Sequence, residues 1–529
     1  MDLKPNKHLV TTYRPKLILT LGMLLFISFG TKVNGQYFSN RYTQNTRDGF
    51  LSSLQIVDDT IYAMFNVGDS VNKPIGAFAK FDRTGSLLST QYFDIPARLG
   101  GIGTNVNTLI RSNDGGFAYG GWTQGAMQTQ NALLLLKYDR SGNFQWYNEV
   151  IDTNYLSFYP SALAQDSSSN YFFTGFLTHK VSNDDDIYIA KTDSAGNLIY
   201  MKILSDPNLN DAASGICINA RGHIVIGGSG VMPNVTNFLN VQGYMKTFEL
   251  DTGGNVINYV INPDPNGPAS ANILSLKDGG YLISSEYTCG RSPDHVYGVN
   301  CIEKLDSAFN VVWRTDAGVC SINNNSHSLS KTPDGNFIAT GVSYNDTVLG
   351  TRPTNGFIVK VSEAGSLIWS KEYRGLSNST NNDMNEFTSV GFLSDSTIIV
   401  GGLSLDYADA GHPEQGWLLH LDTAGCLPDS NSCGIVNGIS DISPNAIKLV
   451  IYPNPADDII NINYALSNVP EQAKIIIVNP LGQQVYDGSM TNTSGIKTIN
   501  TKSWPQGMYF YTVQSDRGFE TAGSFVVNH

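Results

Sequence analysis

The sequence predicts an all-β fold, and three observations lead to this prediction. Only 15% of the 529 residues are charged while glycine occurs 52 times, which is typical of extracellular β-proteins rather than of helical enzymes. An apolar strand followed by a turn of the Asp-x-x-Gly type recurs seven times before residue 427, and a second apolar strand follows the turn in six of these copies. Alternating apolar segments broken by Asn, Pro and Gly fill the last ~80 residues. We therefore expect two β-rich domains in series.

The N-terminus has the order of a secretory signal peptide. A basic flank is followed by an apolar run from Leu17 to Phe29 and then by Val33-Asn34-Gly35. This pattern predicts a signal peptide over residues 1–35, with cleavage between Gly35 and Gln36. A membrane anchor is the alternative, but the run is shorter than the ~20 residues that span a bilayer. We expect no transmembrane segment in the mature chain.

The internal repeats are regular in length. Their turns start at intervals of 57, 54, 58, 55, 56 and 60 residues, at Asp82, Asp139, Asp193, Asp251, Asp306, Ser362 and Asp422. A second hairpin precedes most copies, as in Asn113-Asp114-Gly115-Gly116, where glycine accepts the positive φ that a tight turn needs. Four antiparallel strands per repeat predict a blade. We therefore expect residues 36–426 to form a seven-bladed β-propeller of four-stranded blades.

Aromatic residues recur at one position of the repeat, seven residues after the turn start. They are Trp146, Tyr200, Trp313 and Trp369, while Ser89 and Asn258 are exceptions. Such rings either pack neighbouring blades together or stack on a ligand. We expect packing, because a four-stranded sheet cannot bury both of its faces by itself.

The seventh repeat lacks a recognisable fourth strand, because Pro428 and polar residues follow Cys426 and Leu427. Near the N-terminus, the segment 36–42 (QYFSNRY) has strand character and precedes the first repeat. We predict that this segment supplies the missing outer strand of the last blade. Such a clasp would close the ring and hide its open edges.

The repeats resemble the roughly 55-residue propeller repeats of secreted Bacteroidetes proteins, in which a strand ends in Lys, an apolar residue and Asp-x-x-Gly. The resemblance covers about residues 45–426, although Phe309 stands in place of the glycine in one copy and Ser362 in place of the aspartate in another. Proteins with these repeats have varied functions. The resemblance therefore implies an architecture and not an activity.

The C-terminal part reads as a linker over residues 427–448 and a small Ig-like β-sandwich over residues 449–529. Three motifs lie in it in order: Tyr452-Pro453-Asn454-Pro455, then Gly482 with Val485-Tyr486, then Gly507 with Tyr509. Together they resemble the type A sorting domain of the type IX secretion system. This resemblance implies recognition by the outer-membrane export machinery and removal by a sortase-like peptidase. A carbohydrate-binding or adhesive sandwich is the alternative.

Six cysteines suit a protein exported to an oxidising compartment. Cys426 and Cys433 close a short loop and are the first disulfide prediction. Cys289 with Cys301 is the second.

Cofactor and nucleic-acid binding find little support in the sequence. Asp184, Asp185 and Asp186 form an acidic cluster that could hold calcium, although a solvated loop is the alternative reading. We expect no other cofactor. The formal net charge of −13 argues against nucleic acid as a partner, because such binding needs basic residues that neutralise phosphates.

No nucleophile elbow, zinc-binding helix or phosphate-binding glycine loop occurs in the sequence. We also read the glycine-rich segment 99–105 (LGGIGTN) as a loop. We expect a secreted or cell-surface protein that binds or adheres to a protein or glycan without catalysing a reaction, through loops on one face of the propeller. The alternative is a secreted polysaccharide-degrading enzyme, a lyase or a glycosidase, with its site at the propeller channel.

Overall fold

The computed structural model describes most of the chain as two compact units, Met1–Gly438 and Ile439–His529. No helix that could cross a membrane is present in its described residues. The predicted signal peptide, with Gly35 and Gln36, and most of the predicted linker lie outside them and stay predictions. The described residues are 37–42, 49–68, 74–93, 99–125, 131–151, 155–180, 184–204, 210–231, 243–262, 271–291, 296–318, 323–344, 354–375, 384–405, 414–427, 448–465, 473–479, 483–490, 494–515 and 518–528.

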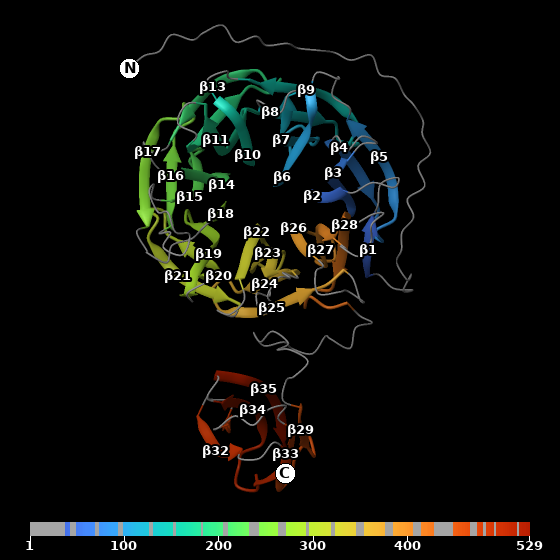
Figure 1. The fold of residues 1–529 in the computed structure, drawn as a ribbon, viewed down its shortest axis with the longest axis vertical. Coiled ribbons are helices and arrows are strands. Elements are labelled where there is room, and N and C mark those ends of the chain that lie inside the picture. The colour runs from blue at the N-terminus through green and yellow to red at the C-terminus, as the bar shows by residue number, and fades with distance from the viewer. Residues whose placement is uncertain are drawn as a thin grey trace. The chain divides into compact units, whose positions relative to one another are not determined.

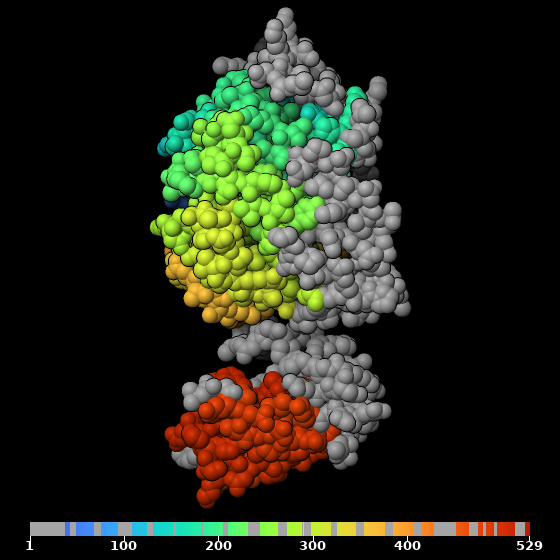
Figure 2. Space-filling model, turned by 90° about the vertical axis from the view of Figure 1, so that its left-hand side faces the viewer, coloured from blue at the N-terminus to red at the C-terminus, as the bar shows by residue number. Residues whose placement is uncertain are grey.

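The first unit is a ring of seven four-stranded antiparallel sheets in its described part, which confirms the predicted propeller (Figure 1). Along the rim the colours pass from green through yellow to orange, because the blades follow one another in chain order (Figure 2). Blades 1 to 3 contain β2 (Gly49–Val57), β3 (Thr60–Gly68), β4 (Pro74–Phe81) and β5 (Leu87–Phe93); β6 (Leu99–Arg111), β7 (Phe117–Gly125), β8 (Asn131–Tyr138) and β9 (Phe144–Val150); β10 (Tyr155–Gln165), β11 (Tyr171–His179), β12 (Asp185–Thr192) and β13 (Leu198–Ile203).

The remaining blades repeat this order, with the first strand of each blade innermost around the ring axis (Figure 1). Blades 4 to 7 contain β14 (Asn210–Ile218), β15 (Ile224–Val231), β16 (Gly243–Leu250) and β17 (Val256–Asn262); β18 (Ala271–Ser275), β19 (Tyr281–Arg291), β20 (Val296–Leu305) and β21 (Val311–Ala317); β22 (Asn323–Lys331), β23 (Phe337–Tyr344), β24 (Thr354–Val361) and β25 (Leu367–Tyr373); β26 (Met384–Phe392), β27 (Ile398–Leu405), β28 (Glu414–Leu421) and β1 (Phe38–Tyr42).

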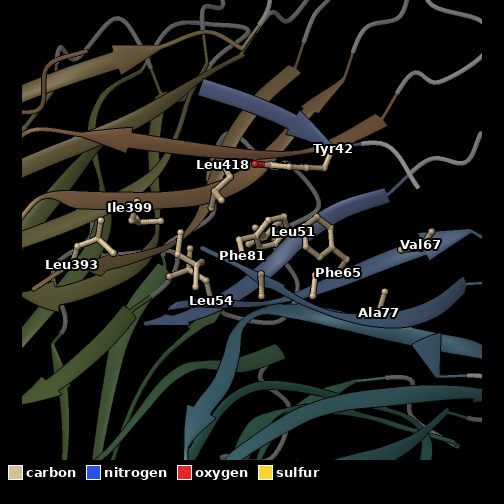
Figure 3. Close-up of a cluster of buried hydrophobic side chains, with 13 residues drawn as sticks. Tyr42, Leu51, Leu54, Phe65, Val67, Ala77, Phe81, Leu393, Ile399 and Leu418 are labelled. Carbon is tan, nitrogen blue, oxygen red and sulfur yellow. The ribbon is translucent and has the colours of Figure 1, made fainter. Parts of the chain in front are cut away.

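The ring closes through the N-terminal strand, as predicted. β1 pairs antiparallel with β28, with Phe38 opposite His420, and so becomes the outer strand of blade 7. Tyr42 of this strand reaches the next blade, where its ring packs on Phe81 and its hydroxyl donates to the carbonyl of Gly85 at 2.5 Å. Figure 3 shows Tyr42 beside Leu418 in the buried cluster shared by blades 7 and 1. The two ends of the propeller are therefore joined by one continuous core.

Thirteen hairpin turns among the described residues have the same geometry. The first residue exchanges two backbone hydrogen bonds with the fourth and fifth, and the fourth has a φ between 67° and 88°. Where the first residue is aspartate, as at Asp139, its Oδ1 accepts the N–H groups of Ser141 and Asn143 at 2.8 Å. Because the strands are antiparallel, these turns share one face of the ring, which we call the turn face. The other connections leave from the opposite face, which we call the loop face.

The aromatic column packs on the neighbouring blade. Rings of one blade lie over the turn glycine of the next, so that a Cβ on that glycine would come within 2.5–2.9 Å of the ring. These pairs are Phe38 with Gly85, Trp146 with Gly196, Tyr200 with Gly254, Trp313 with Gly365, and Trp369 with Gly425. The expected packing role is confirmed.

One seam, as we call the interface between two neighbouring blades, reverses this arrangement. Blade 4 has Asn258 in the aromatic column, and the turn position facing it in blade 5 is Phe309 instead of glycine. Phe309 is 6% exposed and its ring lies 5.1 Å from that of Tyr281. The aromatic side chain has therefore moved to the other side of the seam, at the cost of a positive φ of 68°.

The prediction that residues 99–105 form a loop is wrong. These residues belong to β6, where Ile102 pairs with Thr123 and Thr104 with Gly121 of β7, and the pairing shifts between Thr104 and Leu109. The backbone hydrogen bonds offered by β7 outweigh the low strand propensity of glycine. Irregular pairing at both ends of this stretch accommodates the glycines.

The second unit is a two-sheet β-sandwich in its described residues, which agrees with the predicted Ig-like domain. Inward-facing residues of both sheets, including Ile460, Ile475, Tyr509 and Phe525, form its core. One sheet has the order β29-β30-β33 and the other β32-β31-β34-β35. The strands are β29 (Lys448–Tyr452), β30 (Ile459–Ala465), β31 (Ala473–Val478), β32 (Gln484–Met490), β33 (Ser494–Asn500), β34 (Gly507–Ser515) and β35 (Gly518–Val527).

Candidate functional site

The first sorting motif lies on the surface, beside the last strand of the sandwich. Tyr452, Pro453, Asn454 and Pro455 are all exposed at the end of β29. The Asn454 side-chain oxygen accepts the N–H of Val526 at 2.9 Å. The following residue, Ala456, donates to the Val526 carbonyl at 2.7 Å and forms a parallel bridge with β35. The motif therefore lies along the edge of β35.

The other two motifs face the core. Val485 and Tyr486 of β32 pack against it, and Tyr509 of β34 is 0% exposed. The Tyr509 hydroxyl donates to the carbonyl of Pro505 at 2.8 Å, and its ring packs on Trp504. Gly507 starts the same strand, while Gly482 lies outside the described residues. These side chains hold the sandwich together and leave little for a partner to contact.

In the propeller, three titratable side chains meet near the ring axis. His327 of β22 and Glu386 of β26 belong to the innermost strands of blades 6 and 7, and Nε2 of His327 lies 2.9 Å from Oε1 of Glu386. This contact is an ion pair when the imidazole is protonated. Glu286 of β19 in blade 5 interacts electrostatically with the same imidazole. Its side chain lies over Gly298. We call these three residues the His327 cluster.

A β-bulge in the innermost strand creates the position of His327. The same bulge recurs in blades 1, 3, 4, 6 and 7, five residues before the first residue of the turn that follows the strand. The bulged residues are Ser52, Ser161, Ser214, His327 and Thr388. The small residues at this position can bond to a backbone carbonyl, as Thr388 does when its hydroxyl donates to the carbonyl of Leu51 in blade 1 at 2.7 Å. Blade 6 alone among these five places a titratable side chain there.

The electrostatics of the cluster are coupled. Burial raises the pKa of Glu286 to about 7, against a smaller lowering by His327. Burial alone would lower the pKa of His327, but the carboxylates of Glu386 and Glu286 outweigh it and raise that pKa. Burial would raise the pKa of Glu386, but the charge of His327 outweighs it and lowers that pKa. Near neutral pH the cluster therefore combines an ionised carboxylate with a carboxyl group that still carries a proton in part of the molecules.

The predicted calcium ligands do not form a cradle. Asp185 accepts a hydrogen bond from the Thr178 hydroxyl at 2.7 Å, while Asp186 is buried and lies 2.5 Å from Nε2 of His179. Neighbouring residues of a strand point to opposite faces, so Asp185 and Asp186 diverge along β12 and Asp184 lies before it. Within the described residues, no three His, Cys, Asp or Glu side chains are arranged to hold a metal ion.

Both disulfide predictions are wrong. Cys426 is a buried free thiol 3.3 Å from Nζ of Lys371, and Cys433 lies outside the described residues. Cys301 is also free, whereas Cys289 is disulfide-bonded to another partner. Cys301 pairs with Ser285, and Cys289 lies four residues further along β19. At ~3.3 Å per residue this separation exceeds the ~7 Å that a disulfide can bridge between Cα atoms.

Comparisons with known proteins identify the C-terminal domain and find solved structures of low similarity. Residues 450–528 match the family described as a secretion system C-terminal sorting domain. No curated protein matches the chain. Solved structures similar to it include the Neurospora crassa Pan2 WD40 domain (10% identity, 70% of this chain and 89% of that one, TM-score 0.40) and the β-propeller domain of the Pyrococcus furiosus Trilobed protease (10%, 71% and 95%, 0.38).

A third similar structure is the Penicillium chrysogenum alpha-L-arabinanase complexed with arabinobiose (14% identity, 63% of this chain and 96% of that one, TM-score 0.39). At such values, structural likeness carries no argument about activity. The propeller assignment rests on the strand pairing described above.

The fold and the C-terminal match define a class: an exported β-propeller protein with a sorting domain. More particularly, the chain is a cargo of the type IX secretion system, and its C-terminal domain interacts with that machinery. Its destination is the cell surface or the medium.

Proposed function

We propose that the propeller is a non-enzymatic binding or adhesion module for a protein or glycan, with its binding site at the loop-face end of the ring axis. The His327 cluster is the observation that carries this proposal. Glu386 lies near the loop-face start of β26, seven residues before the turn of its blade, and His327 lies at the middle of β22, five residues before its turn. The turn face, by contrast, is built from uniform hairpins.

The chemistry of the cluster suits a ligand rich in hydroxyl or amide groups. A carboxylate accepts hydrogen bonds, a protonated carboxyl and an imidazolium donate them, and a sugar or peptide offers both kinds of partner. The side chains of His327 and Glu386 are 19% and 18% exposed, although Nε2 of His327 itself is buried. Each comes from a different blade, which would let a ligand contact several blades at once.

The test is a binding screen of the mature chain against glycans and extracellular proteins, repeated with His327→Gln. The matched control is His179→Gln, because His179 also pairs with a carboxylate but lies on the second strand of blade 3. We expect binding to fall at least tenfold for His327→Gln only, as for a typical buried polar contact in a binding site. Equal binding by both variants would exclude the His327 cluster as the site.

A second candidate function is a polysaccharide-degrading enzyme with its site at the same cluster. The observation that favours it is that His327 interacts both with an ionised carboxylate, Glu386, and with a carboxyl whose pKa is about 7, Glu286. Glycoside hydrolysis uses two carboxyl groups in these two protonation states. Glucan, xylan and arabinan panels analysed for shortened products test this candidate. Product formation that Glu286→Gln abolishes would favour the enzyme over the binding module.

A further inference from the structure

The sandwich unit has an apolar surface that its core does not use. On the outer side of the sheet β32-β31-β34-β35, five apolar residues alternate with core residues along three adjacent strands. Met508 and Phe510 are 48% and 37% exposed, and the other three are half-buried. We call these residues the apolar outer face: Ile476, Val478, Met508, Phe510 and Val526.

Strand pairing makes this face continuous. Phe510 lies opposite Val478 of β31, and Met508 lies opposite Val526 of β35. Directly opposed residues of neighbouring strands have Cβ atoms ~5 Å apart, so these side chains form one patch across three strands. A contiguous exposed apolar patch is typical of a surface that a partner covers.

The outer side of the other sheet differs in composition. Ile459 and Ile496 are 43% and 61% exposed there, but polar residues lie between them. Asn461 and Thr498 form a hydrogen bond of 2.7 Å on that side. Exposed apolar residues therefore occur on both sheets, but only the apolar outer face joins them across opposed strands.

The sorting motifs indicate what covers this face. Tyr509 is buried, so a recognition protein cannot contact its side chain, but its strand neighbours Met508 and Phe510 point outward. The exposed motif at Asn454 binds the backbone of Val526, which itself belongs to the apolar outer face. The exposed motif therefore borders the apolar outer face, and the strand that carries Tyr509 also carries Met508 and Phe510 of that face.

We propose that the apolar outer face is the docking surface through which the sorting domain binds an outer-membrane protein of the type IX export machinery. The partner presents a complementary apolar strip, because Val478 opposes Phe510 and Met508 opposes Val526. The charged Asp487 lies at the edge of the face, opposite Ile476. This inference rests on the sorting-domain assignment of residues 450–528 and adds the surface that the machinery recognises.

The test compares three forms of the full chain in a bacterium that has the type IX system. The first carries Met508→Asn with Phe510→Asn, and the matched control carries Ile459→Asn with Ile496→Asn on the opposite sheet. The third carries Met508→Leu with Phe510→Leu, which keeps the face apolar. The ratio of extracellular to periplasmic chain is measured, and thermal unfolding of each purified chain verifies that the sandwich is folded.

We expect the asparagine pair on the apolar outer face to lower the export ratio at least tenfold, as loss of two central apolar anchors does for binding. The control and the leucine pair should export like the unaltered chain. A photo-crosslinking residue at position 508 should capture an outer-membrane export protein, and one at position 496 should not.

Three outcomes would overturn the inference: export of all forms, equal retention of the face variant and the control, or crosslinks from position 508 to a second copy of this chain only. A further form, truncated before Val450, distinguishes a wrong docking surface from a wrong sorting-domain assignment. If the truncated chain is retained while the face variant is exported, the sorting domain stands and only the docking surface is wrong.

Discussion

The seams between blades predict a difference between two glycines of blade 6. Gly335 and Gly365 both occupy the fourth position of a turn and both have a φ of +88°. A Cβ on Gly365 would lie 2.5 Å from Cδ2 of Trp313, whereas nothing lies within 4 Å of a Cβ on Gly335. Alanine in the left-handed region costs roughly 1–2 kcal/mol at either position. Overpacking adds about 1–3 kcal/mol at Gly365 alone.

We therefore expect Gly365→Ala to lower the free energy of unfolding by about 1–3 kcal/mol more than Gly335→Ala. Urea unfolding of the mature chain, followed by tryptophan fluorescence, measures both values. Adding Trp313→Ser should remove most of the extra cost, because serine occupies the same repeat position in blade 1 as Ser89. Equal destabilisation by the two alanine substitutions would refute the packing of this seam.

Three further predictions concern buried groups. Because burial raises the pKa of Glu286 from 4.5 to about 7, the folded state holds a proton that the unfolded state loses, so stability falls as pH rises between these values. Glu286→Gln should remove up to ~3 kcal/mol of this loss, as pH-dependent unfolding would show. Lys246 and Asp211 form an ion pair of 2.5 Å with both side chains 0% exposed. Lys246→Met should cost about 3–5 kcal/mol in calorimetry, and Asp211→Leu added to it should recover part of that. Alkylation of the unfolded, unreduced chain should label Cys426 but not Cys289 in mass spectrometry.

The internal repeat made the propeller predictable from the sequence. The closure of the ring by the N-terminal strand was predictable because the seventh repeat lacks its own fourth strand. Both depend on local signals: turn residues at fixed positions and alternation along strands. The segment 36–42 could be assigned to blade 7 because it had strand character and no partner in its own repeat. The sandwich followed in the same way from its turn motifs.

The His327 cluster was not predictable, because its members come from three blades and lie up to about 100 positions apart along the chain. The one available signal was the presence of His327 where four other repeats have serine or threonine. The disulfide predictions failed for a related reason. Short spacing along the chain suggested the two pairs. In the structure, however, the strand register places Cys301 opposite Ser285 and not opposite Cys289, and Cys426 lies beside Lys371 at the last turn.

Export by the C-terminal domain is the central claim and can be measured directly. Cells expressing the full chain are fractionated beside cells expressing a chain truncated before Val450, and mass spectrometry determines the mature ends. We predict extracellular or surface-bound full chain beginning at Gln36, and periplasmic retention of the truncated form. Equal export of both forms would contradict the claim, because residues 450–528 would then carry no sorting signal.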